Sequence, residues 1–359
     1  MLTLDGSRYE GGGQMLRTAM ALSCLTGKDF RMMNIRAGRN KPGLKMQHVT
    51  AGKLLMKLCD AKCAGFFEGS MEIEFFPGKP VGGVVAVDIG TAGSVTLLLQ
   101  SVLLPCCFAE KRTILRITGG TDVAWSMSND YFAHVVLPYY RQYADIEYSV
   151  ERRGFYPVGG GQVSIKIVPK HGLHEFGSVD ALRAHLQPLL VVERGRLFSI
   201  KLMASASSDL AAHKVAEQQA EAARIRLVSK STVDVRHSYG PTDCPGSVLF
   251  GMALFSAAAD EPREPVRTGV DVLGDGLHPE EVGKKVAELL LGVIDSGTLD
   301  PHIGDNLVPL VGLAGGQVRC PVTSHAKANA HVCEQFLGGK FNLSDGIAYE
   351  APTGSVDEA

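Results

Sequence analysis

A chain of 359 residues with 45% hydrophobic and 21% charged side chains can bury a large core and has the composition of a folded protein, which excludes a disordered class. Its formal net charge of −2 argues against a protein that coats a nucleic-acid duplex through a broad basic face. The eight scattered cysteines form no pair of CxxC knuckles, which argues against a structural zinc site and favours free thiols in a reducing compartment.

The N-terminal region shows no targeting signal, and its charge differs from that of the rest of the chain. The opening sequence MLTLDGSRYE has neither the basic nor the apolar region of a secretory signal, and no apolar stretch approaches the roughly 18 residues that span a bilayer. We therefore expect a cytoplasmic protein that contacts no membrane. The first 60 residues carry ten lysines and arginines against four acidic residues, a local charge of +6 that favours an anion site.

One pattern occurs three times: an apolar helical stretch, a short strand, a polar turn and a second helix. The copies begin with the helical stretches at 15–27, 94–110 and 306–316 and end with those at 45–61, 128–144 and 326–337. If three such units pack around a pseudo-threefold axis, the turns that contain Arg36, Asp122 and His325 should meet at one site. Three separate surface turns are the alternative.

The chain between the second and third copies is too long for one connection. It contains a strand, a helix with apolar residues at helical spacing, and two further strands. We predict an inserted small α/β domain at 183–278, a large three-repeat domain at 1–182 and 279–341, and a C-terminal strand or tail at 342–359. The predicted fold class is thus α/β (α+β), with three tandem βα-type repeats around a pseudo-threefold axis and an inserted domain.

The segment DGSRYEGGGQMLR contains the first candidate ligand-binding residues. Three glycines before a helix let the backbone approach a ligand closely, and the N-terminus of the helix offers N–H groups to an anion. Glu10 could hold a divalent metal, and Arg17 could bind a phosphate through two parallel hydrogen bonds. A plain glycine turn is the alternative.

The segment IRAGRNKPGLKMQH is a second dense set of hydrogen-bond donors. Arg36, Arg39, a lysine and the pair Gln47 and His48 would suit a polyanion, and a solvated basic loop is the alternative. Two more glycine-rich turns, GGTD at 119–122 and RGFYPVGGG at 153–161, have turn geometry alone as their alternative.

The segment TSHAKANAH, which contains His325 and His331, leaves three roles open for His325: a structural histidine, a metal ligand or a nucleophile. Ser324 lacks a G-x-S-x-G elbow, which argues against a hydrolase dyad. The chain also lacks the P-loop, Rossmann and HExxH motifs, so any ATP would be bound without those devices.

Six segments occur in the order expected of the RNA 3'-terminal phosphate cyclases, and the chain resembles that family over nearly its whole length. The segments are EGGGQMLR, IRAGRNKPGLKMQH, GTAGSVTLLLQ, GGTD, RRGFYPVGGGQV and TSHAKANAHVCEQFL. The resemblance implies three repeats akin to those of the enolpyruvyl transferases, with a smaller domain inserted before the third. It also implies that ATP adenylates a histidine, that AMP passes to an RNA 3'-phosphate, and that the 2'-hydroxyl then closes a 2',3'-cyclic phosphate.

The resemblance also implies roles for particular residues. His325 matches the nucleophile in a motif like S/C-H-x-x-x-N, which leaves His331 outside the chemistry. The remaining implied roles are metal binding for Glu10 (Mg²⁺ or Mn²⁺), phosphate binding for Arg17, Arg36 and Arg39, a lining role for Gln47 and His48, and nucleoside contacts for Gln100 and Asp305. The implied partners are ATP and RNA with a 3'-phosphate end, and a homodimer is left open.

The chain departs from the family pattern at two places. His302 precedes Asp305 where the family commonly has an aromatic residue, which affects the stacking of adenine and the strictness for ATP. The run after GGTD lacks the usual prolines and contains Trp125, which could stack a base or pack at a rim.

Three alternatives stay open. A cyclase-like branch that acts in ribosomal RNA maturation shares the fold but lacks the histidine, so the presence of His325 and Glu10 favours the enzyme. An enolpyruvyl transferase would consume phosphoenolpyruvate and would never be labelled by AMP. A module that only binds RNA ends would bind with salt-dependent affinity and convert nothing.

Overall fold

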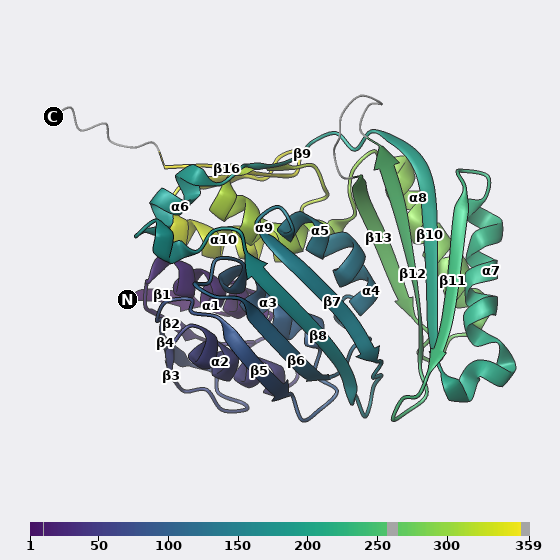
Figure 1. The fold of residues 1–359 in the computed structure, drawn as a ribbon, viewed down its shortest axis with the longest axis horizontal. Coiled ribbons are helices and arrows are strands. Elements are labelled where there is room, and N and C mark those ends of the chain that lie inside the picture. Colours follow the sequence, from purple (N-terminus) through teal and green to yellow (C-terminus); the bar gives the residue numbers. More distant parts are fainter. Residues whose placement is uncertain (10, 257–264, 353–359) are drawn as a thin grey trace.

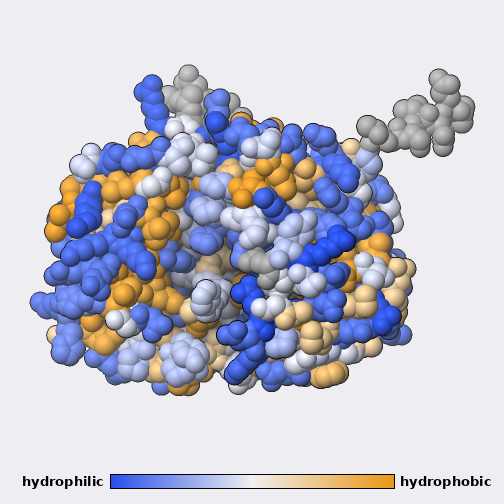
Figure 2. Space-filling view, turned by 180° about the vertical axis from the view of Figure 1, so that it is seen from behind, coloured by the Kyte–Doolittle hydropathy of each residue, from blue (hydrophilic) through white to orange (hydrophobic). Residues whose placement is uncertain are grey.

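The computed structural model describes residues 1–9, 11–256 and 265–352, and within these ranges the chain forms four sheets of four strands each. Figure 1 shows a larger part, which holds three of these sheets, and a smaller sheet beside it. Seen from behind, the surface of the molecule is hollowed between the two parts (Figure 2). This arrangement confirms the mixed α/β class predicted from the sequence.

The first sheet has the strand order β1-β2-β4-β3. Strands β1 and β2 are parallel, as their connection through a helix requires, whereas β4 is antiparallel to both β2 and β3. Helix α1 follows β1, and helix α2 follows β2. The elements are β1 (Leu2–Asp5), α1 (Gln14–Thr26), β2 (Phe30–Met33), α2 (Met46–Leu58), β3 (Lys62–Ala64) and β4 (Ile73–Phe76).

The second sheet repeats this order as β5-β6-β8-β7, with β5 and β6 parallel and the other pairs antiparallel. The helix predicted after β6 is interrupted, because η1 between α4 and α5 has π-helical hydrogen bonds. The elements are β5 (Gly83–Asp88), α3 (Val95–Cys107), β6 (Thr113–Gly119), α4 (Asn129–Tyr131), η1 (Phe132–Val136), α5 (Leu137–Tyr140), β7 (Ala144–Arg152) and β8 (Gly161–Pro169).

The third sheet has the order β9-β14-β16-β15 and the same strand directions, although β9 is distant from the other strands in sequence. Two short helices, η2 (Leu173–Glu175) and α6 (Val179–His185), precede β9. The remaining elements are β9 (Leu189–Val191), α9 (Pro301–Ala314), β14 (Gly316–Val318), α10 (Ser324–Leu337), β15 (Lys340–Asn342) and β16 (Ile347–Glu350).

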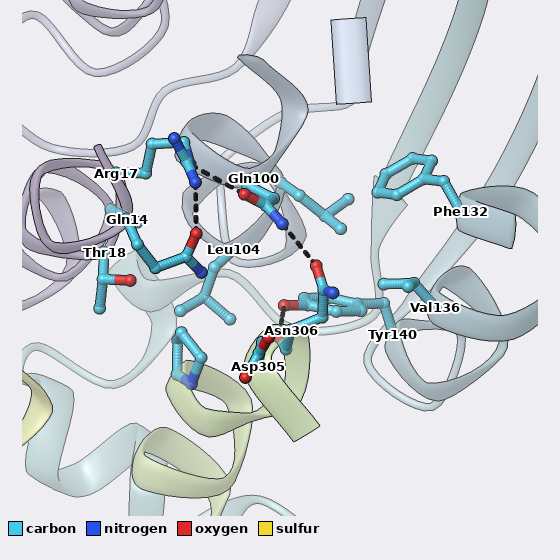
Figure 3. A pocket seen from close by; sticks show the side chains of 13 residues that line it. Gln14, Arg17, Thr18, Gln100, Leu104, Phe132, Val136, Tyr140, Asp305 and Asn306 are labelled. Carbon is cyan, nitrogen blue, oxygen red and sulfur yellow. Dashed lines mark hydrogen bonds between the residues drawn. The ribbon is translucent and has the colours of Figure 1, made fainter. Parts of the chain in front are cut away.

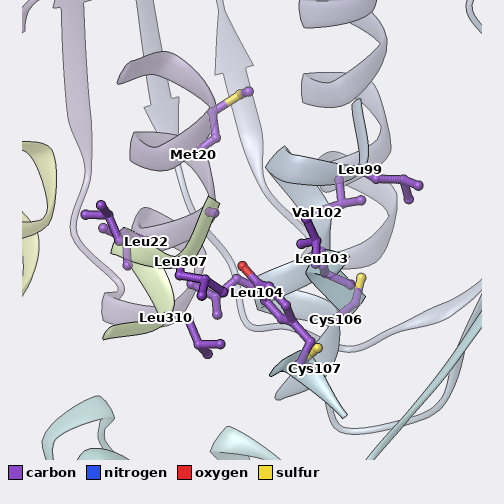
Figure 4. Packing of buried hydrophobic residues seen from close by; sticks show 14 of the residues in the cluster. Met20, Leu22, Leu99, Val102, Leu103, Leu104, Cys106, Cys107, Leu307 and Leu310 are labelled. Atoms are coloured by element: carbon purple, nitrogen blue, oxygen red, sulfur yellow. The ribbon is translucent and has the colours of Figure 1, made fainter. Parts of the chain in front are cut away.

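The core of the larger part lies where α1, α3 and α9 meet. Almost every residue of these three helices is buried, which is typical of helices that are surrounded on all sides. Figure 4 shows side chains from them packed together, among them Leu22, Leu104 and Leu307. Helix α1 joins β1 to β2, α3 joins β5 to β6, and α9 leads into β14, so each of the three sheets contributes one helix to this core.

The fourth sheet has its own core, which it forms with two helices. Its strand order is β11-β10-β12-β13, and α7 and α8 pack against it and against each other. A side chain at Gly283 of α8 would overlap the backbone of α7, so glycine there allows close packing. The elements are β10 (Arg196–Ser207), η3 (Ser208–His213), α7 (Val215–Leu227), β11 (Val233–Gly240), β12 (Ser247–Ser256), β13 (Val266–Leu273) and α8 (Pro279–Ser296).

The extent of this smaller core differs at both ends from the range 183–278 predicted for the inserted domain. Strand β9 pairs with β14 in the larger part, and α8 packs on the smaller sheet. Strand pairing at one end and helix packing at the other join segments distant in sequence, which composition does not reveal. Part of the predicted tail pairs as β16, while residues 353–359 lie outside the described residues. No helix in the described ranges is long and apolar enough to cross a membrane.

The buried carboxylate of Asp300 joins the two parts. It caps α9 by accepting from the N–H of Ile303 at 3.0 Å, and it accepts from the hydroxyl of Tyr131 at 2.6 Å in the larger part. From the smaller sheet it accepts the hydroxyl of Thr268 at 2.7 Å and the N–H of Gly269 at 3.2 Å. A single buried side chain thus fixes how α9 meets the smaller sheet.

Replacing Asp300 with alanine should destabilise the protein strongly, because it leaves several buried donors without their acceptor. We expect Asp300→Ala to lower the free energy of unfolding by about 3 kcal/mol, measured by urea unfolding. Asp180→Ala is the matched control, because that carboxylate is 83% exposed and pairs only on the surface. Equal stability of the two variants would contradict the joining role of Asp300.

Candidate active site

The N-terminal end of α1 collects hydrogen-bond donors from three segments. Its N-cap is Gly13, which has no side chain that could cap the first N–H groups of the helix. A Cβ at Gly13 would overlap Nε2 of His48 and lie 3.0 Å from Nη1 of Arg17, and a Cβ at Gly12 would lie 3.4 Å from Nη2 of Arg39. The glycines therefore leave space that these donors border, next to the positive end of the helix dipole.

His48 is buried and points a donor into this space. Its Nδ1 accepts the N–H of Lys45 at 2.9 Å, so the neutral ring carries its proton on Nε2. Nε2 has no hydrogen-bond partner among the described residues. Burial, followed by the charges of Arg17, Arg36 and Lys45, lowers the pKa of His48 to about 3. The site thus offers a neutral, buried N–H that suits an acceptor oxygen from a ligand.

A chain of hydrogen bonds runs from α1 through α3 to α9 (Figure 3). Nε of Arg17 donates to Oε1 of Gln100 at 2.8 Å, and Nε2 of Gln100 donates to Oδ1 of Asn306 at 2.6 Å. Arg17 also donates to Gln14. Asn306 in turn donates to the carbonyl of His302 at 2.7 Å. This chain orients the guanidinium of Arg17 and joins helices from all three sheets of the larger part.

Arg36 and Arg39 belong to the loop that leads into α2. Arg36 has a left-handed φ of 55°, and its Nη1 donates to the carbonyls of Lys41 at 3.0 Å and Gly43 at 2.9 Å. Burial and the charge of Arg39 lower the pKa of Arg36. Two like charges held close together would be stabilised by an anion between them.

His325 lies in the first turn of α10, beside Asp305. The hydroxyl of Thr323 caps the helix by accepting from the N–H of Ala326 at 3.0 Å, and it also donates to Oδ1 of Asp305. Nδ1 of His325 is 3.8 Å from Oδ2 of Asp305, and the imidazole side chain is 42% exposed. An accessible histidine whose Nδ1 faces a carboxylate presents Nε2 on the opposite side of the ring.

Asn329 lies one turn after His325 on α10. Its Nδ2 donates to the carbonyl of Asp305 at 2.8 Å, and its Oδ1 accepts the hydroxyl of Thr18 at 2.7 Å. Asn329 thus joins α10 to α9 and α1 and positions His325 through the helix that carries it.

Gln47 lies one residue before His48 and faces α3. Its Oε1 accepts the N–H of Ser94, the N-cap of α3, at 3.0 Å. Gln47 therefore links the starts of α2 and α3, and it also lines a cavity next to them.

The structure groups the predicted residues into two neighbouring sets. The first set surrounds the end of α1 and consists of Arg17, Arg39, His48 and Gln100. The second set consists of Asp305 on α9 and His325 on α10, which face each other. The sets adjoin because Asn306, which holds Gln100, follows Asp305 in α9. His331 instead contacts Arg8, with 3.2 Å between Nε2 and Nη1.

The predicted metal ligand Glu10 lies outside the described residues, and the described residues contain no group of three or more His, Cys, Asp or Glu side chains that could hold a metal ion. No sequence motif indicated a role for Gln14, Thr18 or Asn306, which take part in the hydrogen bonds of the site. Gln14 follows directly on three glycines and Asn306 on Asp305, so adjacency to a motif was the available signal.

His48 should make stability depend on pH. Its folded pKa of about 3 lies below the ordinary value of 6.5, so the unfolded chain binds a proton first as the pH falls. The contribution of the neutral ring is complete above pH 6.5 and is lost progressively towards pH 3. Between pH 7 and pH 5 the free energy of unfolding should fall by about 2 kcal/mol more in the wild type than in His48→Asn, measured by urea unfolding. Parallel pH dependences would contradict this.

Comparisons with known proteins bear on the whole chain. A model of the family "RNA 3'-terminal phosphate cyclase" matches residues 8–343. A protein of that name from Pyrococcus furiosus is 37% identical over 364 residues, with 100% of both chains covered. One from Methanopyrus kandleri is 40% identical over 350 residues, covering 94% of this chain and 93% of the relative. One from Archaeoglobus fulgidus is 39% identical over 345 residues, covering 94% and 96%.

Proposed function

This chain belongs to the RNA 3'-terminal phosphate cyclase family, and from that premise we propose that it uses ATP to convert an RNA 3'-phosphate end into a 2',3'-cyclic phosphate. One observation carries the proposal: the accessible imidazole of His325 has its Nδ1 facing Asp305, and the next residue, Asn306, holds Gln100, which in turn holds Arg17 at the end of α1. The donors at that end are Arg17, Arg39 and the buried N–H of His48.

The first step is the transfer of AMP to His325. Nε2 attacks the α-phosphorus of ATP, a bond forms between nitrogen and phosphorus, and pyrophosphate leaves. The ring becomes positively charged, and the carboxylate of Asp305 next to Nδ1 stabilises this charge and holds the ring in place. The cationic and neutral donors at the end of α1 stabilise the negative charge on the phosphates.

The next two steps pass AMP to the RNA and remove it again. An oxygen of the RNA 3'-phosphate attacks the phosphorus of the histidyl-AMP, and the bond to His325 breaks. The neighbouring ribose 2'-hydroxyl then attacks the RNA phosphorus and loses its proton, so that AMP leaves and the cyclic phosphate remains. Both steps place several phosphate charges between Arg17, Arg36 and Arg39, which fits the net positive charge of the N-terminal segment.

A divalent ion, Mg²⁺ or Mn²⁺, would take only part of its ligands from the protein. Glu10 would provide one carboxylate, and the ATP phosphates would provide further oxygen ligands, which is the usual way in which Mg²⁺ is bound with nucleotides. When bound, the ion would neutralise phosphate charge.

We further propose that the three sheets are repeats related by a pseudo-threefold axis, as in the enolpyruvyl transferases, with the smaller part inserted between the second and third. Their identical strand orders and directions support this, as does the shared core of α1, α3 and α9. Such symmetry would bring the turns after β2, β6 and β14 to one site.

The proposed function is tested by following the end of a 3'-phosphorylated oligoribonucleotide, which becomes resistant to phosphatase when it cyclises. The wild type should cyclise it only when ATP is present. His325→Ala should lower the rate about a thousandfold or more, because the nucleophile is lost. His331→Ala, the matched histidine on the same helix, should keep the wild-type rate. An inactive wild type, or an active His325→Ala variant, would refute the proposal.

Asp305 is proposed as a positioning residue, so its loss should affect the rate rather than ATP binding. We expect Asp305→Asn to lower kcat for the labelling of His325 by about 10- to 100-fold while KM for ATP stays within about twofold. Asp345→Asn, at an exposed surface carboxylate, is the control. A rise in KM with an unchanged kcat would show instead that Asp305 contacts the nucleotide.

A further inference from the structure

A cavity of about 720 Å³ lies between the larger part and the smaller sheet. Its walls combine Leu97, Trp125 and Tyr156 from the larger part with Leu210, Gly246 and Leu273 from the smaller one. Ligand sites in proteins commonly measure roughly 300–1,000 Å³ and lie where two structural units meet. We name this space the base cavity.

Two aromatic side chains border the base cavity without being packed into the core. Trp125 is 97% exposed and Tyr156 is 73% exposed, although large aromatic rings are ordinarily mostly buried. Trp125 also has a left-handed φ of 68°, which is strained for a bulky residue and is typical of ligand-binding loops. The loop keeps this conformation because Asp122 accepts from the N–H of Asn129 at 3.1 Å and Ser126 donates to the carbonyl of Val123 at 2.9 Å.

The segment RGFYPVGGG, for which the proposed chemistry has no use, forms the junction at this wall. A side chain at Gly246 of the smaller part would overlap the ring of Phe155, so the two segments pack closely. Sγ of Cys244 donates to the carbonyl of Phe155 at 3.3 Å, and Arg152 forms an ion pair with Asp243. These contacts hold Tyr156 at the cavity.

The base cavity adjoins the proposed active site. Gln47 lines the cavity, and the next residue, His48, points its donor at the end of α1. On α3, Leu97 lines the cavity, and one turn later Gln100 holds Arg17. A molecule whose phosphate lies at the end of α1 would therefore extend into the cavity.

The charged residues that line the base cavity determine which part of a nucleotide it can bind. The ionisable wall residues other than Tyr156 are the carboxylates Asp122 and Asp275, and Asp122 is already ion-paired with Arg153 at 2.9 Å. Such a wall offers no cationic side chain to a phosphate, whereas uncharged nucleobases stack well on exposed aromatic rings. The basic residues lie instead at the end of α1 and in the loop before α2.

We propose that the base cavity holds the 3'-terminal nucleobases of the substrate RNA, stacked on Trp125 and Tyr156, while the terminal phosphate lies at the end of α1. This inference rests on the proposed function and names where its RNA substrate binds. It assigns to Trp125 and Tyr156 a role in RNA affinity that is separate from the transfer of AMP.

Trp125 is the one tryptophan of the chain, so its fluorescence reports on the base cavity directly. Titration of the wild type with a 3'-phosphorylated oligoribonucleotide should quench this fluorescence in a saturable way. ATP alone should leave it unchanged. An oligoribonucleotide that keeps its 3'-phosphate but lacks the two terminal bases should also leave it unchanged, which separates recognition of bases from recognition of phosphate.

Kinetics with variants complete the test. Trp125→Ala should raise KM for the RNA about tenfold, Trp125→Phe should stay within about threefold, and neither should change the labelling of the protein by ATP. Phe198→Ala is the matched control, because this exposed aromatic residue lies at the opposite end of β10 from the cavity.

The outcomes separate this inference from the proposed function. Quenching by ATP alone, or an unchanged signal with RNA that the protein cyclises, would overturn the inference. An unchanged KM in Trp125→Ala would do the same. Base-dependent quenching by a protein that does not cyclise the RNA would refute the proposed function and support the base cavity.

Discussion

The hydrogen-bonded chain from Arg17 through Gln100 to Asn306 is the interaction on which the larger part of the protein depends for its geometry. The helices that carry these residues are mostly apolar and almost fully buried, so packing alone would tolerate small shifts between them. Hydrogen bonds at 2.8 Å and 2.6 Å require one relative position of α1, α3 and α9. Because Asp305 precedes Asn306, the same position places the carboxylate beside His325.

The site is built at a cost in stability that its ligands would offset. Arg17 and Arg36 raise the local positive potential, and His48 stays neutral because it is buried beside them. A helix end without a capping side chain and the N–H of His48, which has no hydrogen-bond partner in the part of the chain that the structure describes, both lower the stability of the folded chain. Phosphate groups would satisfy all of these groups at once, which is why such an arrangement is typical of functional sites.

Much of the fold could be predicted from the sequence, and the rest depends on contacts between distant segments. The helices α1, α2, α3 and α10 follow apolar periodicity, and the mixed α/β class followed from them. Short strands such as β3 and β9 have three residues each, too few for a pattern, and β9 pairs with β14 across the whole smaller part. The π-helical turns of η1 also have no sequence signature.

The candidate site, like the fold, could be predicted only in part from the sequence. Motifs located Arg17, Gln100 and His325, but which atoms face each other depends on packing. The nucleoside contact implied for Asp305 stays a prediction. Its place beside the imidazole of His325 could not be predicted from the sequence, because it requires α9 and α10 to meet. Trp125 stands out in the sequence as the single tryptophan, whereas the cavity that it borders is formed by segments far apart in sequence.

The central claim is that His325 carries AMP during the reaction, and peptide mass spectrometry tests it most directly. The protein is incubated with ATP and Mg²⁺ or Mn²⁺, digested at neutral to alkaline pH, and searched for peptides that have gained one AMP. The account predicts a single modified site at His325, stable in alkali and lost in acid. AMP on another residue, or none on a protein that cyclises RNA, would contradict it.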